Sequence, residues 1–203
     1  MTALTERYAR AVEYARIAHA GQVRKGTAVP YLSHVLGVST LVLEAGGDED
    51  QAIAALLHDV VEDCGAAHEA AIRAQFGDEV AAIVMACTDA SAERKAAHDE
   101  PEARRRDWRA RKQAYLAHLR QAPAPVLLVS SCDKLYNARS IVADLEDPAT
   151  GTDVFERFTA GRDGTLWYYA TLLAVFAERG TPILRPFASS VKRMHVLAGV
   201  AFA

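Results

Sequence analysis

Apolar residues recur every three or four positions through most of the chain, and this spacing is the feature that most limits its possible folds. Such a period lines apolar side chains along one face of an α-helix, whereas a half-buried strand needs alternation at every second residue. Glycines and prolines separate the periodic runs, as residues that end helices do. We therefore predict an all-α protein, folded as a compact helical bundle.

The runs also predict the order of the helices. The first covers about 5–19 and the second 31–44, and a third begins after Asp48 and carries His58 and Asp59. Further helices are expected at about 67–75, 79–87, 105–121, 126–146 and 165–179. The first residues of 126–146 could also form a strand, but no partner strand is evident. Segment 88–104 is polar and is expected to be irregular, and the tail after Pro182 shows no clear helical or strand pattern. Since no linker divides residues 1–203, we expect one domain.

Composition narrows the class of protein. With 51% apolar and 24% charged residues, the chain has the balance of a globular protein, and its net charge of -3 provides no overall basic field for nucleic acid or an anionic membrane. Its first residues lack an apolar signal core, so a cytoplasmic protein without a membrane or nucleic-acid partner is expected. The three cysteines form no C-x-x-C pair, which argues against a thiolate zinc site or a disulfide framework.

A His-Asp pair lies at the end of an apolar helix, in the segment AALLHDVVED. Taken alone, His58-Asp59 is more often an ordinary histidine beside a surface carboxylate, because short motifs have many chance matches. Glu62 follows His58 by four residues and Asp63 follows Asp59 by four, so all would share one end of a helix face if the helix continues. Three carboxylates that close would repel one another unless a cation lay among them.

Two further polar residues interrupt apolar helices elsewhere: His34 in PYLSHV and Asp133 in CDKLYN. Each alone could be structural, since a buried histidine can bond a carbonyl and a buried aspartate can pair with a basic group. With His58 and Asp59 they make a mixed nitrogen and oxygen ligand set, with coordination positions open for water and a phosphate oxygen. The sequence therefore predicts one divalent cation, preferably Mn²⁺, with Fe²⁺ or Zn²⁺ as alternatives.

Several motifs occur in a fixed order along the chain: the basic pair Arg24-Lys25, the segment from Pro30 to His34, the block from Ala55 to Asp63, the turn Phe76-Gly77 and the segment from Asp133 to Asn137. In this order the chain resembles the HD-domain phosphohydrolases, and within them the hydrolase domains of the Rel/Spo-homologue family that break down the alarmone ppGpp. The resemblance covers roughly residues 5–180. The length leaves no room for the synthetase and regulatory modules of long members, so the chain is most similar to the small stand-alone hydrolases.

The resemblance implies roles for particular residues. The metal ligands of the family fall on His34, His58, Asp59 and Asp133, and its catalytic acidic pair falls on Glu62 and Asp63. Residues that would contact the nucleotide substrate are Arg24, Lys25, Lys112, Asn137 and Ser140. Without the family, Arg24-Lys25 would be read as a solvated loop, and the run 104–112 as a solvated helix face. Trp167, Tyr168 and Tyr169 are expected in the core and its rim, and the remaining histidines, His19, His68, His98, His118 and His195, are interpreted as structural.

The implied activity is hydrolysis of the 3′-diphosphate of ppGpp or pppGpp, which releases pyrophosphate and leaves GDP or GTP. The loop RKGTAVPY is shorter than in some relatives, and segment 88–104 cannot be aligned, so the choice of substrate is less constrained than the metal site. One alternative is the same chemistry on another nucleotide, such as NADPH. A second is a nucleotide-binding sensor with little turnover, against which the acidic pair Glu62-Asp63 argues. The sequence leaves the oligomeric state open.

Overall fold

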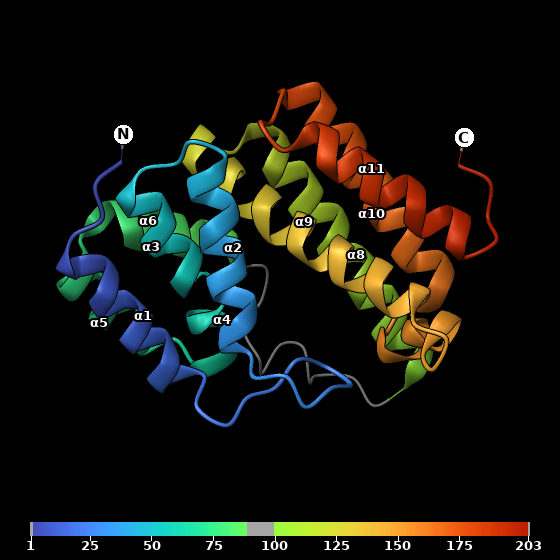
Figure 1. Ribbon diagram of the computed structural model, residues 1–203, viewed down its shortest axis with the longest axis horizontal. Helices are drawn as coiled ribbons and strands as arrows, with labels where there is room; N and C mark the ends of the chain where they lie inside the picture. Colours follow the sequence, from blue (N-terminus) through green and yellow to red (C-terminus); the bar gives the residue numbers. More distant parts are fainter. Residues whose placement is uncertain (1, 89–99, 203) are drawn as a thin grey trace. The chain divides into compact units, whose positions relative to one another are not determined.

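The computed structural model describes residues 2–88 and 100–202, and in these residues the prediction of an all-α protein is confirmed (Figure 1). The described helices are, in chain order, α1 (Glu6–Ala18), α2 (Leu32–Glu44), α3 (Glu49–Leu57), α4 (Val60–Cys64), α5 (His68–Phe76), α6 (Asp78–Cys87), α8 (Pro101–Gln121), α9 (Ala124–Glu146), the 3₁₀ helix η1 (Gly151–Arg157), α10 (Gly161–Arg179) and α11 (Leu184–Leu197). Extended pairing in the described ranges is limited to an isolated antiparallel bridge between Val23 and Pro30. None of the described helices combines the length and apolar character that a membrane crossing requires.

The helices form two compact units. The first contains the described part of Met1–Ala97 together with Ala122–Asp133, and the second contains the described part of His98–Gln121 together with Lys134–Ala203. Helix α9 contributes to both units, and the boundary falls directly after Asp133. All four predicted metal ligands therefore belong to the first unit.

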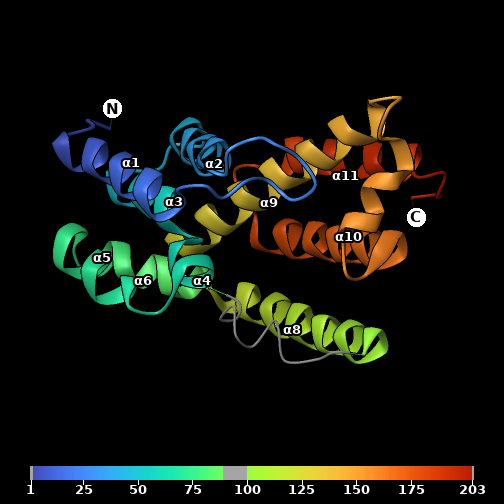
Figure 2. The same ribbon diagram turned by 90° about the horizontal axis from the view of Figure 1, so that it is seen from below.

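Helix α3 is the centre of the first unit. Its residues from Ala52 to Leu57 have no solvent exposure, because α1, α2 and α6 all pack against it. Helix α5 in turn packs on α6 (Figure 2). A capping box forms the start of α3. The Asp48 carboxylate accepts a hydrogen bond from the backbone N–H of Gln51, and the side-chain oxygen of Gln51 accepts one from the backbone N–H of Asp48. A buried and well-capped α3 thus delivers His58 at its end.

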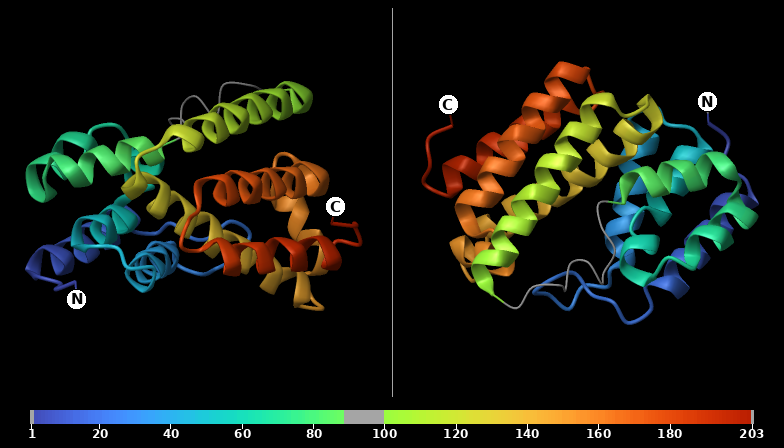
Figure 3. Two further views of the ribbon diagram at one scale, coloured as in Figure 1. Left: turned by 90° about the horizontal axis from the view of Figure 1, so that it is seen from above. Right: turned by 180° about the vertical axis from the view of Figure 1, so that it is seen from behind.

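In the second unit, α10 packs against both α8 and α11 (Figure 3). Leu172, Val175 and Phe176 of α10 are fully buried, and the ring of Phe176 meets that of Phe187 on α11 at 5.0 Å between centroids. The expected core and rim roles of the aromatic run hold, since Tyr168 and Tyr169 are buried and Trp167 is half-buried.

Several predicted boundaries were wrong. Helix α8 begins at Pro101 and not near 105, because a proline fits the first helical turn, where its missing N–H has no partner to lose. For the same reason Pro125 lies in the first turn of α9, which is helical from Ala124. The tail after Pro182 forms helix α11, and η1 was not predicted. Of the segment expected to be irregular, residues 89–99 lie outside the described residues.

Candidate metal and catalytic site

The sequence predicts one continuous helix through His58 and Asp59, but the structure has a break at this pair. Helix α3 ends at Leu57 and α4 starts at Val60, so His58 and Asp59 form the two-residue junction between them. Both keep helical dihedral angles, and the N–H of Asp63 donates to the carbonyl of Asp59 at 2.8 Å to start the new helix. Glu62 and Asp63 thus lie on α4, and the prediction that all four groups share one helix face is corrected accordingly.

The orientation of the His58 ring is set by a backbone contact. Its Nδ1 lies 2.8 Å from the carbonyl oxygen of Ala55, and since a carbonyl only accepts, Nδ1 carries the proton. The other ring nitrogen, Nε2, then faces the carboxylates of Asp59, at 3.1 Å, and of Asp133, at 3.7 Å. A hydrogen bond at one ring nitrogen that directs the other toward a ligand is the usual arrangement of metal-binding histidines.

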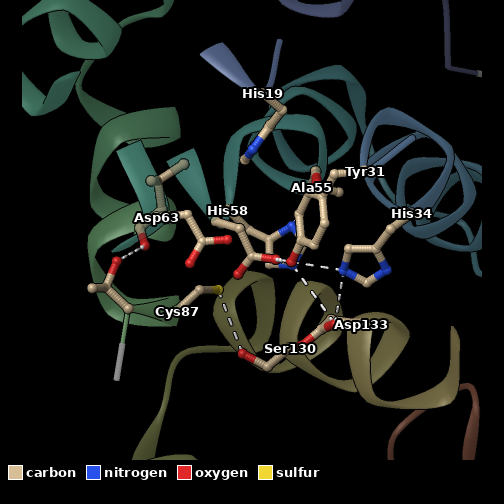
Figure 4. A network of polar contacts seen from close by, with 12 residues as sticks. His19, Tyr31, His34, Ala55, His58, Asp63, Cys87, Ser130 and Asp133 are labelled. Atoms are coloured by element: carbon tan, nitrogen blue, oxygen red, sulfur yellow. Dashed lines mark hydrogen bonds and ion pairs between the residues drawn. The ribbon is translucent and has the colours of Figure 1, made fainter. Parts of the chain in front are cut away.

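His34 approaches the same carboxylates from α2. Its Nε2 lies 3.5 Å from Asp59 Oδ2 and 3.3 Å from Asp133 Oδ1, and its side chain is 1% exposed. The two imidazole centroids are 5.3 Å apart. Figure 4 shows both rings and the Asp133 carboxylate directed toward a common centre. The structure therefore brings together the four residues that were predicted as ligands, from α2, the α3–α4 junction and α9.

Charge coupling in this cluster is strong. Burial disfavours the charged His58 imidazole, but the carboxylates of Asp59 and Asp133 outweigh that effect and hold the pKa of His58 well above its usual value. Burial likewise disfavours the charged Asp59, but His58 and His34 reverse that effect and hold the pKa of Asp59 well below its usual range. Two carboxylates this close are stabilised by positive charge between them. Without a cation, protonated imidazole supplies that charge.

The donor set fits a divalent cation. The ligand atoms of His34, His58 and Asp59 all lie within 4.8 Å of one another. His58 Nε2 is buried and faces the carboxylates of Asp59 and Asp133. Two imidazole nitrogens with two carboxylates suit metals that accept mixed nitrogen and oxygen ligands, and are too few for a closed octahedral shell.

Tyr31 is a site residue that the sequence interpretation missed. Its hydroxyl donates to Asp59 Oδ2 at 2.5 Å, and its ring lies 5.2 Å from that of His34 between centroids. Burial, with the charge of Asp59 beside it, raises the pKa of Tyr31 far above its usual value, so the hydroxyl stays protonated as a donor. Its position three residues before His34, at the start of α2, was the available signal, because that spacing puts two side chains on one helix face.

The acidic pair lies beside the junction. Asp63 is exposed and Glu62 is half-buried. One oxygen of Asp63, Oδ2, accepts a hydrogen bond of 2.9 Å from the side-chain amide of Gln22, a residue that the sequence interpretation had not singled out.

The loop from Gln22 to Tyr31 carries the basic pair. It is closed by two backbone hydrogen bonds, from Arg24 N–H to the Val29 carbonyl at 2.8 Å and from Tyr31 N–H to the Gln22 carbonyl at 2.9 Å. The Arg24 guanidinium carbon lies 5.8 Å from the centroid of the Tyr31 ring, a cation–π distance, so Arg24 lies near the residue that contacts Asp59. Lys25 is exposed on the same loop.

The other three predicted substrate residues belong to the second unit. Lys112 Nζ lies 5.3 Å from the Tyr168 ring centroid, and the Ser140 hydroxyl donates to the Tyr136 carbonyl of its own helix at 3.1 Å. Asn137 is half-buried on α9. Their roles toward a nucleotide stay predictions.

A family model described as "HD domain" matches residues 11–166, which is most of the chain and includes every predicted site residue from Arg24 to Ser140. The chain belongs to the HD-domain family. Among curated relatives, this HD protein is 34% identical over 134 residues to the guanosine-3′,5′-bis(diphosphate) 3′-pyrophosphohydrolase MESH1 of Xenopus tropicalis, covering 64% of this chain and 67% of the relative. It is 32% identical over 138 residues to the Drosophila melanogaster MESH1, covering 66% and 69%.

Longer bacterial relatives match only in part. The HD protein is 42% identical over 83 residues to the guanosine-3′,5′-bis(diphosphate) 3′-pyrophosphohydrolase of Aquifex aeolicus, which is 41% of this chain but 12% of that relative's length. A solved structure, described as a metazoan ortholog of SpoT that hydrolyzes ppGpp, superposes with a TM-score of 0.71 and 26% identity over 99% of this chain and 100% of that one. A protein from Listeria monocytogenes EGD-e superposes with a TM-score of 0.62 and 30% identity, over 82% and 96%.

Proposed function

We propose that this HD protein hydrolyses the 3′-diphosphate of ppGpp and pppGpp, releasing pyrophosphate and leaving GDP or GTP. The observation that carries the proposal is the convergence of two buried imidazoles and two carboxylates from three parts of the fold. The substrate class is supported by the relatives whose length the chain covers by two thirds, both of which carry the name of that activity.

We propose that His34, His58, Asp59 and Asp133 hold one divalent cation, Mn²⁺ in preference to Fe²⁺ or Zn²⁺. When bound, such a cation supplies a Lewis acid that polarises a phosphoryl oxygen and lowers the pKa of a coordinated water. The residues around the cluster keep its ligands aligned: the Ala55 carbonyl orients the His58 ring, and the Tyr31 hydroxyl holds one oxygen of Asp59.

The acidic pair would handle the water that reacts. Glu62 and Asp63 orient it and accept its proton as its oxygen forms a bond to the phosphorus next to the 3′ oxygen. The bond between that phosphorus and the 3′ oxygen breaks, pyrophosphate leaves, and the 3′ oxygen takes up a proton to become a hydroxyl. A positioned carboxylate contributes a rate factor of roughly 10²–10⁴ in such proton transfers.

Orientation would select the 3′ arm over the 5′ arm. Arg24 presents a planar cation beside the Tyr31 ring, next to the metal ligands, and can stack on a purine or bind a phosphate. Lys25, Lys112, Asn137 and Ser140 complete the proposed nucleotide contacts. Because a misplacement of about 1 Å can cost on the order of 10²-fold in rate, these contacts decide which phosphorus reacts.

A substrate panel tests the proposal. Protein loaded with Mn²⁺, Fe²⁺ or Zn²⁺ is incubated with ppGpp, pppGpp, GTP, GDP and NADPH, and the products are resolved by chromatography. We expect pyrophosphate with GDP or GTP from the first two substrates, and no reaction for the His58→Ala variant. Cleavage of NADPH or of a 5′-nucleotide with ppGpp left intact would refute the alarmone assignment, and tight binding of ppGpp without turnover would identify a sensor.

A further inference from the structure

We propose that His19 and Gln22 form a hydrogen-bonded relay that holds the Asp63 carboxylate in one orientation for catalysis. This inference rests on the proposed function, in which Asp63 handles the reacting water. His19 and Gln22 are positioning residues in this scheme, because they act through Asp63 and touch neither metal nor substrate.

The directions of the hydrogen bonds define the relay. A carboxylate only accepts, so the Gln22 side chain presents its NH₂ group to Asp63 Oδ2, at 2.9 Å. The carbonyl oxygen of the same amide then faces His19 Nδ1, at 2.7 Å, and that nitrogen must donate. Each bond thus forces the direction of the next, and rotating the Gln22 amide by half a turn would set an oxygen against the carboxylate.

The far end of the relay is anchored in the fold. His19 is 4% exposed and caps α1, where its N–H donates to the Ala15 carbonyl at 3.0 Å. Its own carbonyl accepts from the N–H of Gln22 at 3.0 Å, so the two relay residues are joined through the backbone as well. The His19 ring also lies 4.9 Å from that of Tyr31 between centroids.

The residue next to Asp63 ties the same two segments together. The Cys64 thiol donates to the Ala18 carbonyl at 3.2 Å, and its sulfur lies 3.7 Å from His19 Nδ1. Burial raises the pKa of Cys64, with the charges of Asp63 and Asp59 adding to the effect, so the group remains a thiol and a donor. The end of α4 is thus fixed against the end of α1, at the point where the relay reaches Asp63.

Two features favour positioning over a purely structural role. Asp63 is exposed, and an exposed carboxylate on a short helix has several side-chain conformations unless a partner selects one. His19 Nε2 is buried and has no hydrogen-bond partner in the part of the chain that the structure describes. An unsatisfied buried nitrogen costs stability, so a ring kept for packing alone would be better replaced by an apolar one. Figure 4 shows the His19 imidazole directed toward the group that contains Tyr31 and Asp63.

The kinetic test removes the relay without touching Asp63. For Gln22→Leu and His19→Leu we expect kcat for ppGpp to fall about 10- to 100-fold, because a carboxylate that is not held in place spends less time in the reactive geometry, with KM and metal content unchanged. His19→Asn should recover most of kcat, because the asparagine NH₂ lies where Nδ1 lies and can donate to Gln22. The matched controls are Gln51→Leu, which removes the capping-box amide of α3, and His195→Asn, which changes a buried histidine of the second unit. Both should keep wild-type kcat.

Crystal structures of wild type and Gln22→Leu give a second readout that needs no activity. We expect one Asp63 conformer in wild type and several in the variant. The relay is refuted, while the function stands, if Asp63→Asn lowers the rate but Gln22→Leu turns over normally. It is also refuted if Asp63 of the Gln22→Leu variant remains in the wild-type conformer. If wild type cleaves no ppGpp, the proposed function fails, and the crystal structures alone decide whether Gln22 orders Asp63.

Discussion

Tyr31 and the Ala55 carbonyl show how single groups outside the ligand set prepare this site. Each fixes one proposed ligand: the carbonyl sets the proton of His58 on Nδ1, and the hydroxyl occupies one side of the Asp59 carboxylate. Ligands held in this way need no reordering when a cation binds, so less of the binding free energy is lost to side-chain entropy.

Replacing Tyr31 by phenylalanine should therefore weaken metal binding. The substitution removes one hydroxyl and keeps the ring that packs on His34. We expect the Kd for Mn²⁺ to rise about 10- to 100-fold, as is typical for the loss of an outer-shell partner. Titration calorimetry measures the change. Tyr14→Phe is the matched control, since that hydroxyl bonds His68 at 2.7 Å and no metal ligand, and an equal effect of both variants would contradict the role of Tyr31.

Protons and the cation should compete for the cluster. In the metal-free protein the pKa of His58 is raised by its carboxylate neighbours, so the ring carries an extra proton at neutral pH, and a metal needs that nitrogen deprotonated. Affinity for Mn²⁺ should therefore rise with pH until the pKa of metal-free His58 is passed, with protons released on binding. Calorimetric titrations in buffers of different ionisation enthalpy measure the release. Binding without proton release at neutral pH would contradict the raised pKa.

The sequence pointed to the four residues that the structure brings together, but not to the groups that orient them. Four polar or charged residues interrupt otherwise apolar helical segments, and such positions can be recognised in the sequence: His34, His58, Asp59 and Asp133. Tyr31, Gln22 and His19 suit a loop or a helix end without any conflict. The spacing of Tyr31 and His34 shows only that these two side chains share a helix face. Which side chain lies opposite Asp59 or Asp63 across the fold cannot be read from the spacing within one segment.

Among the elements, α3 positions His58 at its C-terminal end, and a capping box stabilises the N-terminus of this helix. Asp48→Ala removes the acceptor for the Gln51 N–H and should lower the free energy of unfolding by about 0.5–2 kcal/mol. Urea unfolding measures the change, with the slope against denaturant expected to stay constant. Asp48→Asn should stay close to wild type, because asparagine caps equally well. Equal losses in both variants would show that the charge matters and the cap does not.

Helix α11 illustrates why some elements were missed. Phe187, Val191, Met194 and His195 are buried at helical spacing, so the periodic pattern was present in the tail. Pro186 obscured it, yet a proline in the first turn removes an N–H that has no helical partner there. The junction at His58-Asp59 was missed for the opposite reason, since AALLHDVVED contains no glycine or proline to mark an interruption.

At the scale of the molecule, the cluster joins segments that are far apart in the chain. Its residues come from α2, from the α3–α4 junction and from the last residue that α9 contributes to the first unit. Within the described residues, no disulfide joins any two of these segments. A bound cation would thus cross-link the first unit, and its affinity would add to the stability of the folded state.

Removing the metal should therefore lower the thermal stability of the protein. A ligand that binds only the folded state stabilises it by RT ln(1 + [L]/Kd), about 2.7 kcal/mol at a hundredfold excess over Kd. We expect the Tm measured by calorimetry to fall in excess chelator and to recover when Mn²⁺ is restored. His58→Ala should show a low Tm that neither treatment changes, whereas His195→Asn, altered in the second unit, should respond as wild type does. The same Tm for wild type with chelator and with Mn²⁺ would show that no cation links these helices.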